Sequence, residues 1–315
     1  MSDPASGDTC SIAVVIPAYN RESVIGRAIE SAVSQLRPAD EIIVVDDGST
    51  DRTAAVVHSY GAGVRLIRQP HLGVSAARNL GVESASANWI AFLDSDDFWE
   101  PDHLERMAGA ITATKGQAWL YFSDLRLHPK HGGSSIWARC GLAIDGPFEL
   151  RETDKDWLFT SRQPIMIQAS AVPREAYVEV GGSDTRLARR SDTHLIFKLG
   201  LGGPLCAVAG VAGEWTAGAD NSLTQTVSPA HAVYLRSTTC LYSDLLDTQA
   251  MSRQQRRILS KRLAASHLTL ARQAGIRAPI RVLSHLHRAT HYDPAGTAHR
   301  LVAFVKRNGS VRRSV

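Results

Sequence analysis

The chain has 315 residues, of which 44% are hydrophobic and 21% are charged, a composition typical of a soluble globular protein with one large domain or two smaller ones. The polar start and the lack of any run of about 18 apolar residues argue against a signal peptide and a membrane span in this sequence, so we expect a cytoplasmic protein. No CxxC spacing joins the four cysteines, Cys10, Cys140, Cys206 and Cys240, which argues against a disulfide framework and a zinc site.

The net charge of +4 hides a strong asymmetry along the chain. From Met251 onward, fourteen Lys and Arg stand against one acid, Asp293, so this segment carries +13 and the residues before it carry −9. A basic tail favours an anionic partner such as a membrane surface, although arginines on the solvated face of packed helices give the same pattern. Nucleic acid is not an expected partner, because the tail has few aromatic side chains that could stack on bases.

Strand and helix patterns alternate through the first third of the chain. The β-branched run at residues 11–17 predicts a buried strand, and the apolar stripe from Val24 to Leu36 predicts a helix that Pro38 limits. The pattern repeats as strands at 41–45, 64–68 and 89–93, which alternate with helices at 53–60, at 75–86 and from Pro101 onward. Such units with short connections predict an α/β fold, with a mostly parallel sheet covered by helices on both faces.

Acidic residues follow two of these strands. Asp46 and Asp47 end the second strand, and Asp94, Asp96 and Asp97 end the fourth. Because ligands of parallel sheets bind beyond the carboxyl ends of the strands, we expect both clusters at one edge of the sheet. Their oxygens suit Mg²⁺ or Mn²⁺ that shares its coordination shell with a substrate diphosphate. Strand termination and helix capping, which Asp and Ser also perform, are the alternative interpretation.

Four motifs in this region, taken together, resemble those of the family 2 glycosyltransferases, which have the GT-A fold. They are VVIPAYNRE (14–22), IIVVDDGSTDRT (42–53), GVSAARNLG (73–81) and WIAFLDSDDFWEPDHLE (89–105). The resemblance implies an α/β GT-A fold with a Rossmann-like nucleotide-binding half and a helical C-terminal region. We therefore expect a catalytic domain at residues 1–228, with a nucleotide-sugar half at about 11–125 and an acceptor half at about 126–228, followed by basic helices at 229–315.

The resemblance also implies which residues bind the donor. Asp47, the second acid of its turn, would accept from the nucleotide base, and Arg78 would line the same pocket. Asp94 and Asp96 match the family's DxD motif, whose acids hold the ribose and a divalent cation, Mn²⁺ or Mg²⁺, on the diphosphate. We expect Asp96 above all to bind the metal. The full predicted donor site comprises Pro17, Ala18, Tyr19, Asn20, Glu22, Asp47, Gly73, Arg78, Asp94, Ser95 and Asp96.

A catalytic base is expected from the segment VGGSDTRLARRSDTHLIFKLG (180–200), which has the shape of the family's base-bearing region. Asp192 stands at the matching place before an apolar helix, and residues 168–182 resemble the strand and helix that precede it in the family. The sequence departs from the family in one respect, because Ser191 replaces the acid that usually precedes the base. Asp192 as a simple helix N-cap is the alternative interpretation.

These placements imply the chemistry of an inverting glycosyltransferase. The Asp192 carboxylate would deprotonate an acceptor hydroxyl, which attacks the anomeric carbon of a nucleotide sugar. The resemblance to the family implies a UDP-sugar as this donor. Residues 213–224 lack the Gln-x-x-Arg-Trp motif of processive synthases, so we expect transfer of one sugar, to a sugar or a lipid-linked acceptor. The alternative, motivated by Ser191, is a protein that binds a nucleotide sugar or scaffolds a polysaccharide assembly complex without turnover.

The C-terminal region reads as four helices, at residues 230–246, 253–274, 279–290 and 297–306. Leu259, Leu263 and Leu270 form an apolar stripe on the second of them, and basic residues gather near its start. Such a helix suits peripheral attachment to an anionic membrane. Packing on the catalytic body or on a second subunit, as in a homodimer, fits the same pattern.

Overall fold

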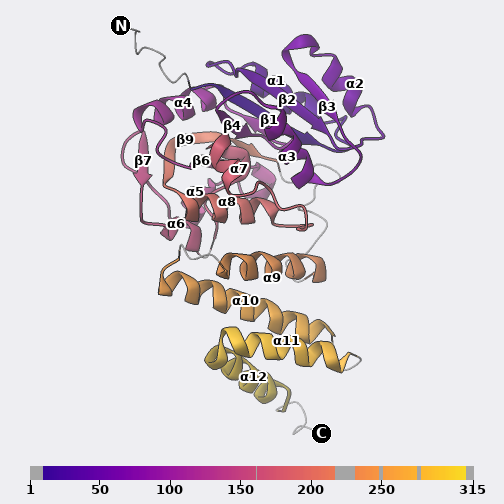
Figure 1. Cartoon of the computed structure of the whole chain (residues 1–315), viewed down its shortest axis with the longest axis vertical. Helices are drawn as coiled ribbons and strands as arrows, with labels where there is room; N and C mark the ends of the chain where they lie inside the picture. The colour runs from indigo at the N-terminus through magenta and orange to yellow at the C-terminus, as the bar shows by residue number, and fades with distance from the viewer. Residues whose placement is uncertain (1–9, 161, 217–230, 248–250, 275–277, 310–315) are drawn as a thin grey trace. The chain divides into compact units, whose positions relative to one another are not determined.

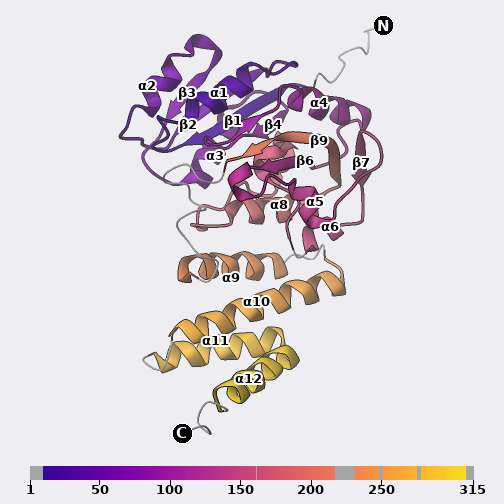
Figure 2. The same cartoon turned by 180° about the vertical axis from the view of Figure 1, so that it is seen from behind.

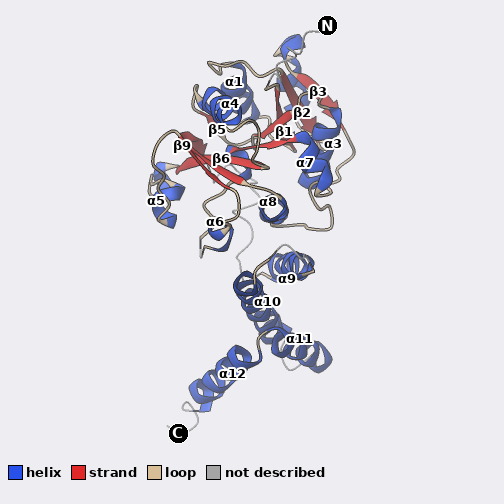
Figure 3. Ribbon diagram, turned by 60° about the vertical axis from the view of Figure 1, so that its left-hand side comes forward, coloured by secondary structure: helices blue, strands red, loops and turns tan. Residues whose placement is uncertain are grey.

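The computed structural model describes residues 10–160, 162–216, 231–247, 251–274 and 278–309 (Figure 1). The chain divides into two compact units. The first comprises residues 1–186 and 191–226, and the second comprises residues 187–190 and 227–315. All the described strands belong to the first unit, whereas the described elements of the second unit are helices (Figure 3).

Four parallel strands form one half of the sheet, in the order β3-β2-β1-β4, and they confirm the predicted strands. They are β1 (Ile12–Ala18), β2 (Glu41–Asp46), β3 (Arg65–Arg68) and β4 (Trp89–Phe92). Each is followed by a helix: α1 (Ile25–Val33), α2 (Thr53–His58), α3 (Val74–Ser84) and α4 (His103–Ala113). The two central strands, β1 and β4, are buried throughout because helices cover both faces, which explains their continuous apolar sequence.

The other half of the sheet is mixed. Its strand β8 (Ser170–Pro173) lies antiparallel between β4 and β6 (Leu120–Leu127), and β9 (Leu205–Trp215) runs parallel to β6. Two further strands, β5 (Phe98–Trp99) and β7 (Phe148–Arg151), pair antiparallel with β9. The remaining helical elements of this unit are η1 (Gly61–Gly63), η2 (Pro129–His131), α5 (Ile136–Cys140), α6 (Asp156–Phe159), η3 (Ile167–Ala169), α7 (Arg174–Glu179) and α8 (Ser191–Gly202).

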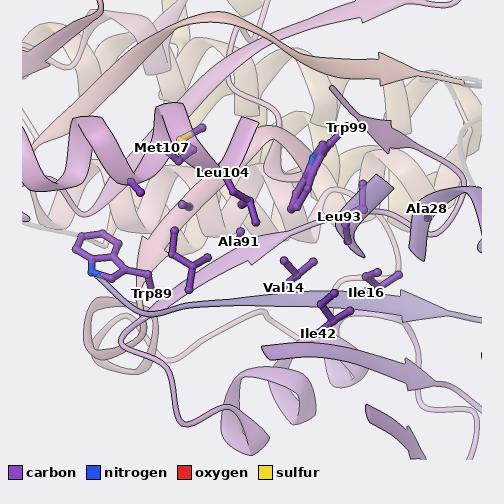
Figure 4. Packing of buried hydrophobic residues seen from close by; sticks show 14 of the residues in the cluster. Val14, Ile16, Ala28, Ile42, Trp89, Ala91, Leu93, Trp99, Leu104 and Met107 are labelled. Carbon is purple, nitrogen blue, oxygen red and sulfur yellow. The ribbon is translucent and has the colours of Figure 1, made fainter. Parts of the chain in front are cut away.

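The main apolar core lies between the sheet and helices α1 and α4, which share one side of it in Figure 3, while α3 and α7 lie on the other side. In Figure 4, Leu104 and Met107 of α4 pack above Ala91 and Val14 of the central strands. These side chains are almost completely buried, which stabilises the fold by roughly 1.5–3 kcal/mol for each large one. The core therefore fixes β1 and β4 against each other and sets where their carboxyl ends lie.

The helix predicted from Val24 to Leu36 is shorter than its apolar stripe, so this prediction was wrong at its end. Helix α1 ends at Val33, and Val33 and Leu36 are 47% and 67% exposed instead of buried. The reason is a contact with a distant segment: the Leu36 N–H donates to the Pro101 carbonyl and the Gln35 side chain donates to the Glu100 carbonyl, each at 2.8 Å. These hydrogen bonds turn the chain away from the helix axis before the last predicted turn.

The second unit is a set of antiparallel helices, seen from both sides in Figures 1 and 2. They are α9 (Ala232–Leu246), α10 (Arg253–Ala274), α11 (Pro279–Tyr292) and α12 (Pro294–Gly309), which confirm the four predicted helices, although the predicted first residue, 230, lies outside the described ones. Helix α10 packs on both α9 and α11, and its predicted stripe of Leu259, Leu263 and Leu270 is buried. None of the described helices combines the length and the apolar content that a membrane crossing needs.

Candidate functional site

The predicted donor-site residues gather where three neighbouring parallel strands end. The register pairs Ala18, at the end of β1, with Asp46, at the end of β2, and β4 lies on the other side of β1. Pro17 and Ala18 are the last buried residues of β1, so their role at this edge is to deliver the following turn. The turns after β1, β2 and β4 therefore leave the sheet side by side, as the sequence predicts.

The turn after β1 is tied to the turn after β2 by hydrogen bonds. Asn20, whose φ is 51°, receives at its side-chain oxygen the N–H of Thr50 at 2.9 Å, and its own N–H donates to the Ser49 hydroxyl. Glu22 accepts from the Arg52 N–H at 2.8 Å. Asn20 and Glu22, both predicted to bind the donor, thus hold the two turns together in the structure described.

Asp47 is the anchor of a third segment, the loop before α3. Its carboxylate accepts from the Gln69 side chain at 2.6 Å and from the backbone N–H groups of Leu72 and Gly73, each at 2.8 Å. The His71 ring completes the set, with Nδ1 placed 2.9 Å from Oδ2 of Asp47. Three protein donors thus bind this buried carboxylate, and the His71 ring, whose Nδ1 is hydrogen-bonded to the Asp47 backbone carbonyl at 3.1 Å, covers the remaining side of Oδ2.

Tyr19 and His71 form an aromatic pair beside Asp47. Their ring centroids lie 3.9 Å apart with an interplanar angle of 23°, a stacked arrangement. Tyr19 is 39% exposed and the His71 side chain is 56% exposed, so the pair is accessible to solvent. The sequence singles out Tyr19 but not His71, and no spacing rule identifies a lone histidine in a loop as a site residue.

The acids after β4 are crowded, and one of them is paired. Arg78 of α3, 4% exposed, binds Asp94 at 2.7 Å. Burial and the Asp94 carboxylate raise the pKa of Asp96 above its usual value, and the Arg21 guanidinium opposes this shift. Burial and the two neighbouring carboxylates raise the pKa of Asp97 well above its usual value, although it accepts from the Thr216 N–H at 2.9 Å. Such mutual repulsion is relieved by a cation.

Among the described residues, no cluster of three or more His, Cys, Asp or Glu side chains is arranged to hold a metal ion. The Asp94 and Asp96 side chains are partly exposed, whereas Ser95 between them is buried. Two carboxylates, whose oxygens are hard ligands, fit Mg²⁺ or Mn²⁺, since these ions keep waters and take phosphate oxygens as further ligands. These two carboxylates are thus suited to a cation that arrives with a diphosphate and less suited to a permanently bound cation.

Asp192 lies in the first turn of α8, where its side chain accepts from the Thr193 N–H at 2.7 Å. It is electrostatically linked to the acids after β4 through one guanidinium. Burial alone would lower the pKa of Arg78, but the charges of Asp94 and Asp192 keep it above its usual value. The predicted base and the first acid of the predicted DxD motif therefore interact with the same buried cation.

A second contact fixes the segment before α8, and the sequence interpretation did not assign it a role. Asn79, next to Arg78 on α3, donates to the Ser183 carbonyl at 2.9 Å and accepts the Ser183 N–H at 2.9 Å. Gly182 lies against it with φ at 62°, and a Cβ there would come 2.8 Å from the Asn79 oxygen. The second glycine of the pair before α8 therefore reflects close packing on α3.

The sequence is similar to that of known glycosyltransferases. The family model described as glycosyl transferase family 2 matches residues 13–140. An uncharacterized glycosyltransferase of Haemophilus influenzae is 26% identical over 195 residues, which are 60% of this chain and 61% of that protein. The succinoglycan biosynthesis protein ExoO of Rhizobium meliloti is 42% identical over 119 residues, 37% of this chain and 34% of that protein. The chain thus spans about three fifths or less of these curated relatives.

Solved structures share the fold at low sequence identity. The crystal structure of S. aureus TarS 1-349 in complex with UDP-GlcNAc has a TM-score of 0.68 and 16% identity, over 91% of this chain and 82% of that one. The mannosyltransferase PcManGT from Pyrobaculum calidifontis, in complex with GDP-Man and Mn²⁺, has a TM-score of 0.57 and 16% identity, over 94% and 79% of the two chains. The mixed sheet with its flanking helices is therefore a GT-A fold, as the sequence predicts.

Proposed function

Because residues 13–140 place the chain in glycosyl transferase family 2, we propose that it transfers one sugar from a nucleotide-diphosphate sugar to an acceptor hydroxyl, with inversion at the anomeric carbon. One observation carries the proposal. The groups proposed for the base (Asp47), the diphosphate (Asp94, Asp96) and proton abstraction (Asp192) come from three separate segments, and the buried Arg78 of a fourth, α3, interacts with both Asp94 and Asp192. Synthesis of a cell-surface polysaccharide or glycolipid is the process in which we place it, as for the succinoglycan relative.

Tyr19 and Asp47 are the proposed contacts for the nucleotide base. An aromatic face for stacking next to a carboxylate suits a base with a ring N–H, and uridine has one at its imide. We therefore propose a UDP-sugar as donor. Solved neighbours with the same fold are described with UDP-GlcNAc and with GDP-Man, so guanosine is the second base to test.

Asp94 and Asp96 are the residues that would hold a divalent cation, with Asp96 as the main ligand. When bound, Mn²⁺ or Mg²⁺ would neutralise the charge that develops on the departing nucleoside diphosphate. Arg78 orients Asp94 by its 2.7 Å contact. Repulsion between these crowded acids destabilises the fold without a ligand, as is common at binding sites.

Asp192 is the proposed general base. Its carboxylate would take the proton of the acceptor hydroxyl as the oxygen attacks the anomeric carbon from the face opposite the diphosphate, so no covalent intermediate with the enzyme is needed. The contact between Asn79 and Ser183 supports this role, because it fixes the segment that leads into α8 against the donor half. If Asp192 only capped the helix, it would not need to interact with Arg78, the guanidinium that also binds Asp94.

The test is a screen of nucleotide sugars with Mn²⁺, Mg²⁺ or a chelator, in which release of nucleoside diphosphate is measured. Asp96→Ala should lose release by two or more orders of magnitude, whereas Asp145→Ala, which alters an exposed loop acid, should not change it. Asp192→Asn should bind the donor with unchanged affinity and lose transfer. Transfer by Asp192→Asn at the wild-type rate would remove Asp192 as the base.

A protein that binds a nucleotide sugar without turning it over is the alternative, and Ser191 in place of an acid favours it. Ser191 is buried at the start of α8, so the second carboxylate of the usual pair has no equivalent at this position. In that case calorimetry would show that the protein binds one nucleotide sugar, whereas the screen would show no release of nucleoside diphosphate with any tested acceptor. Release from one donor that depends on Asp96 and Asp192 would exclude the alternative.

For the second unit, we propose peripheral attachment to an anionic membrane on its cytoplasmic side. Arg253, Arg257 and Lys261 repeat every fourth residue and line one hollow along α10. Ile280 and Leu283 of α11 are 82% and 66% exposed, which is unusual for large apolar side chains three residues apart on a helix. Cationic and apolar groups together favour a lipid surface, where a lipid-linked acceptor would also lie.

Vesicle sedimentation tests this attachment. The protein should sediment with vesicles that contain phosphatidylglycerol and not with phosphatidylcholine alone, and salt should weaken the binding. Replacement of Arg253, Arg257 and Lys261 by Glu should abolish it, and Arg236→Glu, at an exposed position on α9, should weaken it far less. A triple variant that changes the molar mass in solution but not vesicle binding would indicate a homodimer contact instead.

A further inference from the structure

We propose that His71, in the free protein, stands in the place of the donor's nucleobase and competes with it for Tyr19 and Asp47. The inference rests on the proposed function, since it assigns a regulator of affinity to the proposed base site. The motivating observation is a coincidence of two contacts: the same imidazole stacks on Tyr19 at 3.9 Å and points a ring nitrogen at Asp47 from 2.9 Å.

An imidazole resembles a nucleobase in the two properties that this site recognises. It is a planar aromatic ring, so it can cover the face of Tyr19. In the tautomer with hydrogen on Nδ1 it is also a ring N–H donor, and Asp47 has both Oδ2 and its backbone carbonyl within 3.1 Å of that nitrogen. A uracil imide would present the same combination of stacking face and ring N–H.

Three donors bind the Asp47 carboxylate, and the His71 ring covers the side of Oδ2 that they leave. Two of the three are backbone N–H groups, of Leu72 and Gly73, and they cannot leave without unfolding the start of α3. The third is Gln69, whose backbone N–H is itself bound to the Asp46 carbonyl at 3.0 Å. A base that is to bind Asp47 must therefore displace a side chain, Gln69 or His71.

His71 is the side chain that can leave. Over half of it is exposed, so its ring can rotate into solvent. The backbone of His71 is fixed, because Gly48 packs closely against it. A Cβ at Gly48, where φ is 80°, would lie 2.8 Å from the backbone nitrogen of His71. The loop thus keeps its shape while the imidazole exchanges with the base. The displaced ring returns when the nucleotide departs, which favours product release.

This exchange has a measurable cost in affinity. If the bound state of His71 dominates in the free protein, the apparent dissociation constant of the nucleotide is raised by the reciprocal of the open fraction. The hydrogen bond of the imidazole to the Asp47 backbone carbonyl, its close contact with the Asp47 carboxylate and one stacking contact make the expected factor about 5 to 20. Removal of the imidazole should therefore tighten nucleotide binding, although it deletes a side chain at the site.

The experiment is titration calorimetry of the full chain with UDP and, separately, GDP in the presence of Mn²⁺. His71→Ala should bind the preferred nucleotide about 5- to 20-fold more tightly than wild type. His71→Phe keeps the ring for stacking but cannot donate to Asp47, so its gain should be smaller. The matched control is His58→Ala, at an exposed histidine that ends α2, and it should leave the dissociation constant unchanged.

Pyrophosphate with Mn²⁺ serves as a probe without a base, and its affinity should be the same for wild type and His71→Ala. Equal or weaker nucleotide binding by His71→Ala, with wild type binding normally, would overturn the inference and leave the proposed function standing. An equal gain for pyrophosphate would also overturn it, because the effect would not lie at the base. Wild-type protein that binds neither UDP nor GDP would overturn the inference and the proposed base site together.

Discussion

Acidification should destabilise the first unit through one buried histidine. His103, in the first turn of α4, has no solvent exposure and packs against Trp99, with ring centroids 4.7 Å apart. Neither ring nitrogen has a hydrogen-bond partner in the described part of the chain. Burial, reinforced by the positive charge of Arg106, lowers the pKa of His103 from 6.5 to about 3. The ring therefore has to stay neutral in the folded state.

The sign and size of the effect follow from proton linkage. Below pH 6.5 the unfolded chain protonates this histidine and the folded chain does not, so the free energy of unfolding falls as the pH falls. Between pH 8 and pH 5 the loss from His103 should be about 2 kcal/mol, and it approaches about 4–5 kcal/mol only near the folded pKa. A loss of 2 kcal/mol is a large share of the stability of an ordinary domain.

Urea unfolding at pH 8 and pH 5, followed by tryptophan fluorescence, measures this loss. The fluorescence signal reports on the first unit and not on the helices of the second unit, because all six tryptophans belong to the first. They are Trp89, Trp99, Trp119, Trp137, Trp157 and Trp215. His103→Leu should remove about 2 kcal/mol of the pH dependence, and His58→Leu, at an exposed site, should not. Parallel losses in wild type and His103→Leu would refute the reasoning.

The other predictions concern the candidate site. Asp94→Asn should destabilise the first unit by roughly 2–3 kcal/mol, because it leaves the buried Arg78 without its carboxylate, whereas Asp96→Asn should be neutral or stabilising, since it relieves repulsion. Urea unfolding measures both, and equal losses would contradict this. Gly182→Ala should cost about 1–2 kcal/mol more than Gly181→Ala: both have positive φ, but only at 182 does a Cβ meet another side chain. Equal midpoints in thermal unfolding would show that the contact gives way.

The sequence predicts the parallel half of the sheet well because each strand there is signalled locally. An apolar run, a turn of Asp, Gly or Asn and an amphipathic helix lie within about thirty residues of one another. The mixed half has no such signal. The two residues of β5 become a strand only by pairing with Gly213 and Glu214, more than a hundred positions away. Strand β8 enters between β4 and β6, a place that depends on three distant segments.

The same distinction applies to the site. Asp47, Asp94 and Asp96 follow predicted strands, so the edge at which they lie could be inferred from strand order alone. Their partners could not, because hydrogen bonds from Gln69 and His71 depend on how a loop folds over Gly48. The helix predicted to extend to Leu36 was wrong for a similar reason, because hydrogen bonds to residues 100 and 101 end the helix before the hydrophobic periodicity does.

Helix α3 explains how residues far apart in the chain become one site. Arg78 and Asn79 are consecutive, so their side chains leave the helix about 100° apart and reach different neighbours. The first binds Asp94, in the donor half, and the second binds Ser183, in the segment that leads to Asp192. One helical turn therefore sets the distance between the proposed diphosphate site and the proposed base. A rigid element in that position is what an in-line displacement requires, because the attacking oxygen and the leaving phosphate must be held on opposite sides of one carbon.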